Sequence, residues 1–111
     1  MAKGIVIPAD EAQPMRVIDV RELSDLQFVV GGYIQPAPIE RDDFSLYCDE
    51  EGKLKGYPLN QRADILWGAF LPEEYRMPGD HLVGDCVLAS YDEEAEGYVD
   101  VPEFLLDQLK L

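Results

Sequence analysis

Prolines and glycines divide this sequence into short apolar segments, and that division constrains the fold more than any other feature. The chain of 111 residues contains eight prolines and nine glycines. Proline cannot continue a strand ladder, and glycine tolerates the positive φ that follows a helix end. No apolar run approaches the roughly 18 residues that cross a bilayer. We therefore expect short strands and helices in a single domain over residues 1–111.

Segments rich in β-branched residues predict the strands. Residues 4–7 end at Pro8 and residues 16–20 alternate apolar with polar side chains, so these two segments are expected to form a hairpin. Residues 81–91 are expected to form a long central strand, with Gly84 as a bulge or a point of close backbone approach. The remaining expected strands are residues 33–39, at an edge because they contain two prolines, 44–48 and, after a hairpin turn at 49–52, 53–57.

Three segments are expected to be helical. The first covers residues 22–31 and stops at Gly31-Gly32, and the last covers 103–110 with Asp100 as its cap. The middle helix covers 61–70 behind Asn60 as N-cap, and its apolar face is predicted to consist of Ile65, Leu66, Ala69 and Phe70. Together these elements predict an α+β fold, with an antiparallel or mixed sheet of about five or six strands, two helices and a C-terminal helix.

The charge restricts the partners. The sequence contains nine Lys and Arg and 23 Asp and Glu, which gives a net charge of −14. Such a chain repels nucleic acid phosphates and anionic lipid headgroups, so we expect neither direct nucleic acid binding nor membrane binding. No segment resembles a signal peptide, so a cytoplasmic location is expected. The acids expected to form an interaction surface are Asp42, Asp43, Asp49, Glu50, Glu51, Asp92, Glu93, Glu94 and Glu96.

Residues with catalytic or metal-binding chemistry are few. Cys48 and Cys86 stand 38 positions apart without a Cys-x-x-Cys motif, so we interpret them as reduced core residues, with a disulfide as the alternative. His81 is the single histidine, and no serine or cysteine lies in a recognisable nucleophile motif. The paired carboxylates lie in turns that are expected to be exposed. We therefore expect neither an enzyme, nor a metal site, nor a cofactor.

The order of several segments carries a family resemblance. These segments are Ile5-Val6-Ile7, Gly31-Gly32-Tyr33-Ile34 after the first helix, Asp49-Glu50-Glu51-Gly52-Lys53-Leu54, Tyr57-Pro58-Leu59-Asn60-Gln61-Arg62-Ala63 and Val83-Gly84-Asp85-Cys86-Val87-Leu88. As an ordered set they resemble a family of small bacterial and bacteriophage proteins, domain of unknown function 3846. The resemblance covers about residues 4–90 and leaves 91–111 as a C-terminal extension. It implies a compact α+β domain, often of phage or mobile-element origin, without an established chemistry.

Two functions are compatible with these observations. The first is non-catalytic binding of a host protein with a basic surface, as an inhibitor or, if the acids cluster strongly or the chain forms a homodimer, as a mimic of DNA. In a phage-encoded protein this would occur in the host cytoplasm. The alternative is a small-ligand, nucleotide-like binding or sequestering protein, whose site would be Tyr33, Tyr57, Asn60, Arg62 and Asp85. In the structural interpretation of the same residues, Asn60 only caps a helix and Arg62 pairs with Asp85 or Asp64.

Overall fold

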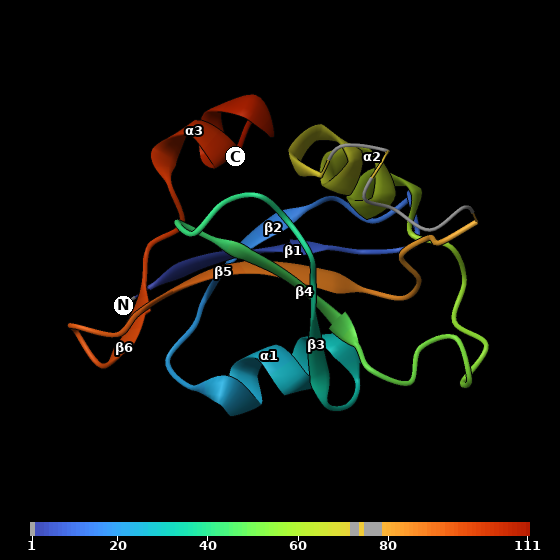
Figure 1. Ribbon diagram of the computed structural model, residues 1–111, viewed down its shortest axis with the longest axis horizontal. Coiled ribbons are helices and arrows are strands. Elements are labelled where there is room, and N and C mark those ends of the chain that lie inside the picture. The colour runs from blue at the N-terminus through green and yellow to red at the C-terminus, as the bar shows by residue number, and fades with distance from the viewer. Residues whose placement is uncertain (1, 72–73, 75–78) are drawn as a thin grey trace.

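An antiparallel sheet of six strands forms the middle layer of the computed structural model, which describes residues 2–71, 74 and 79–111 (Figure 1). Its order is β2-β1-β5-β4-β3, and β6 pairs with the end of β5. The strands are β1 (Lys3–Ile7), β2 (Arg16–Asp19), β3 (Ile34–Ala37), β4 (Ser45–Asp49), β5 (Cys86–Asp92) and β6 (Gly97–Val99). The expected hairpin of the first two strands, the central place of β5 and the edge position of β3 are confirmed.

Helices cover both faces of the sheet. α2 (Gln61–Phe70) and α3 (Glu103–Gln108) lie on one face, and α1 (Leu23–Val30) lies on the other (Figure 1). Alternation along the strands divides the core in the same way, because Ile5 and Leu88 pack with the α2 and α3 side while Val87 and Ala89 pack with the α1 side. The α+β fold with a C-terminal helix is therefore confirmed.

The hairpin expected around residues 49–52 is wrong. β4 pairs with β3 on one side and with β5 on the other, so neither edge is free for residues 53–57. Residues 50–56 instead form turns, closed by the bond from Lys55 N–H to the Glu51 carbonyl and from Tyr57 N–H to the Gly52 carbonyl. The second edge of β4, which the sequence pattern assigned to residues 53–57, is occupied by β5, which begins at Cys86.

The strand expected to begin at residue 81 begins at Cys86. The preceding residues pair with the segment before α2: Asn60 N–H donates to the Leu82 carbonyl, and Gly84 N–H donates to the Pro58 carbonyl. Gly84 has a φ of +75°, and a Cβ atom there would lie 2.6 Å from Cδ2 of Tyr57. The expected close approach is therefore confirmed, and its neighbour is an aromatic ring.

α2 begins where the sequence predicts, because the Asn60 side chain accepts a hydrogen bond from Ala63 N–H. The predicted apolar face is partly wrong. Ala63 and Trp67 are the buried residues, whereas Ile65 is 69% exposed and Ala69 is also exposed. The other two residues of that face are partly buried against the core. Asn60 fixes the start of the helix, and this turns Ala63 toward the sheet.

The C-terminal segment differs from its prediction at its start. α3 follows Pro102, and Asp100 does not cap it, because the Asp100 carboxylate accepts a hydrogen bond from Lys3 N–H at 2.7 Å. Val101 N–H in turn donates to the Lys3 carbonyl. Strand β6, which the sequence did not predict, leads into this contact. The last 12 residues are therefore attached to β1, at the start of the chain.

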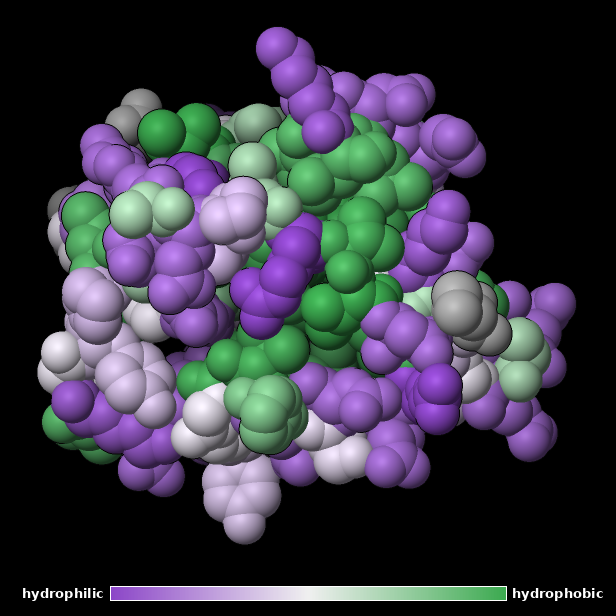
Figure 2. Space-filling model, turned by 180° about the vertical axis from the view of Figure 1, so that it is seen from behind, coloured by the Kyte–Doolittle hydropathy of each residue, from purple (hydrophilic) through white to green (hydrophobic). Residues whose placement is uncertain are grey.

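The surface of the molecule on the side of β2, one edge strand of the sheet, is partly apolar. β2 lies on the far side in Figure 1, so it faces the viewer in Figure 2, where polar residues surround an apolar area. Val17 of β2 is 41% exposed.

None of the helices within the described part of the chain is long and apolar enough to span a membrane.

Candidate functional site

The fold divides the predicted acidic surface into two groups at opposite ends of β4. Asp42 and Asp43 precede this strand, whereas Glu50 and Glu51 follow it. The strand has five residues, which corresponds to about 16 Å at the usual rise per residue. A block of acids that is continuous in the sequence is therefore not continuous on the surface.

The first group is held next to β5, just before a second acidic segment. Ser45 at the start of β4 pairs with Ala89 of β5, and Ser90 Oγ donates a hydrogen bond to the Asp43 carbonyl at 2.7 Å. Asp43 thus lies beside Ser90 of β5, two residues before the turn between β5 and β6, which is at the lower left in Figure 1. We call the combined surface the acidic end; it consists of Asp42, Asp43, Asp92, Glu93, Glu94 and Glu96.

The turn between β5 and β6 is held in one conformation by its own hydrogen bonds. The Asp92 carboxylate accepts from Glu94 N–H at 3.0 Å, and Glu96 N–H donates to the Glu93 carbonyl. Between Arg76 and Lys110 the sequence contains no lysine or arginine, so no basic residue of this segment neutralises the turn. The carboxylates of the turn are exposed. This turn is therefore a concentrated source of negative potential.

Two tyrosines lie next to these acids. Tyr91 and Tyr98 are directly opposite each other in β5 and β6, and their rings meet edge to face at 5.2 Å. Tyr91 is 53% exposed. Burial raises the pKa of Tyr98 above its ordinary value, with Tyr47 and Tyr91 adding to the shift, so its hydroxyl stays neutral. Tyr91 therefore provides an exposed aromatic ring next to Asp92, while Tyr98 packs against the core on the α1 side.

Asp49 does not belong to the acidic surface, contrary to the expectation. Asp49 is 5% exposed, and its carboxylate accepts hydrogen bonds from Lys55 Nζ at 2.7 Å and from Glu51 N–H at 2.8 Å. Burial raises the pKa of Asp49, but the bonds from Lys55, Glu51 and Tyr57 outweigh it and lower the pKa below its usual value. This carboxylate holds the loop after β4 in place.

Arg41 packs against three aromatic rings at the acidic end. Its guanidinium carbon is 4.6 Å from the ring centre of Phe104, 5.6 Å from that of Phe44 and 5.7 Å from that of Phe70. We call these three residues the phenylalanine cage. Asp43 accepts two hydrogen bonds from Arg41, from Nε at 2.8 Å and from Nη2 at 2.6 Å. These bonds raise the pKa of Arg41 and lower that of Asp43.

Asn60 and Arg62, from the predicted ligand set, bind the protein backbone. The Asn60 amide is fully buried and donates to the carbonyls of Ile7 and Gly84. Arg62 Nη2 donates to three carbonyls of the loop after β1, those of Pro8, Asp10 and Gln13. The buried Arg62 Nε makes no hydrogen bond within the described residues. Arg62 thus organises a loop and forms no ion pair with Asp85 or Asp64 among the contacts that the structure gives.

The other three residues of that set lie on two different pockets. Tyr57 and Asp85 line one of about 280 Å³, whereas Tyr33 lines another of about 290 Å³ together with Asp49 and Lys55. The Asp85 carboxylate also accepts a hydrogen bond from Ala9 N–H. Ligand pockets usually begin near ~300 Å³ and use several convergent polar groups. The structure does not assemble the five residues into one site, and ligand binding stays a prediction.

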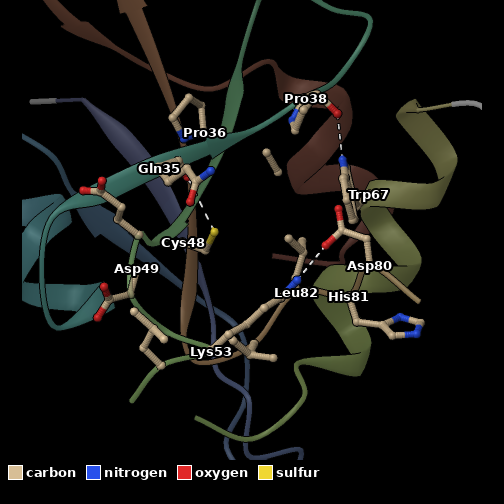
Figure 3. Close-up of a pocket in the computed structure, with 14 residues that line it drawn as sticks. Gln35, Pro36, Pro38, Cys48, Asp49, Lys53, Trp67, Asp80, His81 and Leu82 are labelled. Atoms are coloured by element: carbon tan, nitrogen blue, oxygen red, sulfur yellow. Dashed lines mark hydrogen bonds and ion pairs between the residues drawn. The ribbon is translucent and has the colours of Figure 1, made fainter. Parts of the chain in front are cut away.

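A third pocket, of about 170 Å³, lies between β3, β4, α2 and residues 80–83 (Figure 3). Trp67 Nε1 donates to the Pro38 carbonyl at its back, and the Cys48 thiol points to the Gln35 carbonyl at 3.6 Å. Lys53 and Asp80 form an ion pair of 2.7 Å at its rim. It is the smallest of the three pockets, and its polar groups bind one another.

One comparison with known proteins identifies the family of the chain. The family model described as "Domain of unknown function (DUF3846)" matches residues 2–110. The chain belongs to the DUF3846 family. This match extends past residue 90, so the segment after it, which we expected to be an extension outside the resemblance, lies within the DUF3846 domain as far as residue 110. No curated protein and no solved structure is significantly similar to the chain.

The two thiols of this DUF3846 domain are buried or partly buried, and its histidine lies against a carboxylate. Both cysteines are free, and burial raises the pKa of Cys48 and of Cys86, which opposes formation of a thiolate. His81 Nδ1 lies 3.0 Å from the Asp64 carboxylate, and in Figure 3 its ring points away from Cys48. Within residues 2–71, 74 and 79–111, no three potential ligands gather around a metal position.

Sequence reasoning missed the phenylalanine cage and the tyrosine pair. Phe44, Phe70 and Phe104 are dispersed over 60 positions, and only the packing of α2 and α3 against the start of β4 brings them together. The tyrosines were missed because β6 was missed. One signal was present in the sequence: Tyr91 and Tyr98 flank an acidic turn at a spacing that fits a hairpin.

Proposed function

We propose that this protein is a non-catalytic binding protein whose acidic end docks on the basic surface of a host protein. One observation carries the proposal. Asp43 is hydrogen-bonded to Ser90, two residues before the acidic turn at 92–96, so exposed acids from two segments separated by almost half of the chain lie toward one end of the molecule, with the exposed Tyr91 next to the turn. Opposite charge steers association, and tyrosines supply contact area at a low entropic cost.

The size of this end suits a protein partner. The molecule measures 36 × 28 × 26 Å, so a face across its long axis offers on the order of 700 Å², close to the ~800 Å² that each partner contributes to a standard interface. Duplex DNA presents one charge per ~1.7 Å, or about 16 charges over the same width. Six carboxylates are far fewer. We therefore favour recognition of a basic protein surface over close mimicry of DNA, and inhibition of that host protein by a phage-encoded chain is part of the proposal.

Two triple variants of equal charge test the location. The first is Glu93→Gln, Glu94→Gln and Glu96→Gln at the acidic end; the control is Glu11→Gln, Glu50→Gln and Glu51→Gln, which changes exposed acids elsewhere. The protein is used as bait in host lysate at 0.05 M and 0.5 M salt, captured proteins are identified by mass spectrometry, and the Kd of the purified partner is then measured.

We expect the wild type and the control to bind alike at low salt and both to weaken at 0.5 M, because salt shortens the range of exposed charges. The variant at the acidic end should bind at least tenfold more weakly. Equal binding by the two variants, or a Kd independent of salt, would remove the acidic end as the basis of recognition.

A further inference from the structure

The phenylalanine cage has the chemistry of a guanidinium site, and a guanidinium occupies it. Three rings at mutual angles of 57–81° pack against one another and together form an aromatic surface on one side of the Arg41 guanidinium. Asp43 completes the site with two hydrogen bonds in the geometry that a planar guanidinium fork requires. A lysine ammonium cannot form this fork.

The loop that carries Arg41 is held in place by contacts that do not involve its side chain. Trp67 Nε1 donates to the Pro38 carbonyl at 2.7 Å, Glu40 N–H donates to the Phe70 carbonyl at 3.0 Å, and Ser90 Oγ donates to the Asp43 carbonyl. The Arg41 side chain itself is 38% exposed. It can therefore leave the cage by rotation about its own side-chain bonds, while the rings and Asp43 stay where they are.

The surroundings favour the entry of a second cation. Asp42 and the acids of the turn between β5 and β6 are on the same end of the molecule. Electrostatic attraction therefore concentrates basic side chains at the mouth of the cage. Phe44 is buried and Phe70 and Phe104 are partly buried, so a guanidinium that enters loses part of its contact with water, which strengthens cation–π attraction.

We propose that the phenylalanine cage and Asp43 bind an arginine side chain of the partner, and that Arg41 occupies this site in the free protein as an internal competitor. The inference rests on the proposed function and specifies its partner chemistry: an arginine-bearing basic surface. Because Arg41 must first be displaced, it lowers the apparent affinity by the fraction of molecules in which the cage is open.

The test compares octa-arginine with octa-lysine, which have the same charge. The variant Arg41→Ala opens the cage, and we expect it to bind octa-arginine about tenfold more tightly than the wild type does. Octa-lysine should gain much less, because it gains only from the removal of one positive charge. Adding Asp43→Asn to Arg41→Ala should abolish the preference for arginine. Titration calorimetry at 0.05 M salt measures all the Kd values.

The outcomes separate this inference from the proposed function. Equal gains for both peptides would overturn the cage as an arginine site and leave binding at the acidic end intact. If the wild type bound neither peptide, the proposed function would fail; the cage is then tested alone with Nα-acetyl-arginine amide. That compound should raise the Tm of Arg41→Ala in a saturable manner and the lysine analogue should not, and the absence of a shift would overturn the inference. If Arg41→Ala does not fold, Arg41→Lys retains the stem and the charge and should show the same preference for arginine.

Discussion

The side-chain amide of Asn60 makes three hydrogen bonds at a site closed to water: it accepts from Ala63 N–H and donates to the carbonyls of Ile7 and Gly84. The first bond was predictable from sequence, because an N-cap needs only the residues that follow it. The other two connect α2 to the end of β1 and to the segment before β5. They depend on residues 53 positions before and 24 positions after Asn60, which no local pattern indicates.

Gly84 and Gly56 allow a matched test of the close contact with Tyr57. Both have positive φ, +75° and +73°, but a Cβ at Gly84 meets the Tyr57 ring at 2.6 Å and a Cβ at Gly56 meets nothing within 4 Å. Gly56→Ala should therefore cost only the backbone strain, about 1 kcal/mol, whereas Gly84→Ala should cost about 2–4 kcal/mol because overpacking is added. Urea denaturation measures both. Equal losses would contradict a structural role for the ring.

The carboxylate of Asp49 should make stability depend on acid pH. Its pKa is lowered in the folded protein by Lys55, Glu51 and Tyr57 in spite of its burial, so the unfolded chain takes up a proton more readily as the pH falls. This contribution is present above the ordinary carboxyl pKa of 3.8 and is lost as the pH falls below about 4.

We therefore expect Asp49→Asn to be less stable than the wild type at pH 6, by about 1 kcal/mol or more, and the difference to shrink at pH 3. Urea midpoints at the two pH values measure it, with the exposed neighbour variant Glu50→Gln as a control. A difference that is the same at both pH values would show that the charge of Asp49 does not stabilise the fold.

At the scale of elements, α3 is part of the core. Leu105 is fully buried and Leu106 nearly so, and Phe104 and Leu109 pack partly against the same cluster. Leu105→Ala should destabilise the protein by about 2–5 kcal/mol, because it leaves a cavity between the helix and the sheet. Leu111→Ala, at a position that is 42% exposed, should change stability by less than about 1 kcal/mol. Thermal unfolding measures both, and a similar Tm for the two variants would indicate that α3 is only an appendage.

The elements that sequence patterns predicted correctly are those with local start and stop residues. α1 ends at Gly31, whose φ is +89° and whose N–H donates to the Gln27 carbonyl, as a glycine stop predicts. The prediction of a strand over 53–57 was wrong because an alternation of apolar residues does not indicate which sheet edge is free. β6 was not predicted because its three residues are too few to show a periodic pattern.

At the scale of the whole molecule, composition predicted the negative charge but not its distribution. The division of the acids by β4, the burial of Asp49 and the contact of Asp43 with Ser90, next to the acidic turn, all follow from the strand order. The cage has the same origin, since its three rings come from α2, from α3 and from the residue before β4. The acidic end and the phenylalanine cage both depend on topology, so the sequence indicates which types of residue are available but not which residues come together.

The pairing of β1 with β5 has a consequence for biosynthesis. Residues 5–7 lie in the interior of the sheet, but their partners Cys86–Leu88 occur about 80 residues later. A ribosome that adds roughly 5–20 residues per second needs about 4–16 s to supply them, and during this time one edge of β1 has no strand beside it. The nascent chain therefore cannot complete its sheet until residues 86–88 have been synthesised, and until then it presents an unpaired apolar strand to chaperones and proteases.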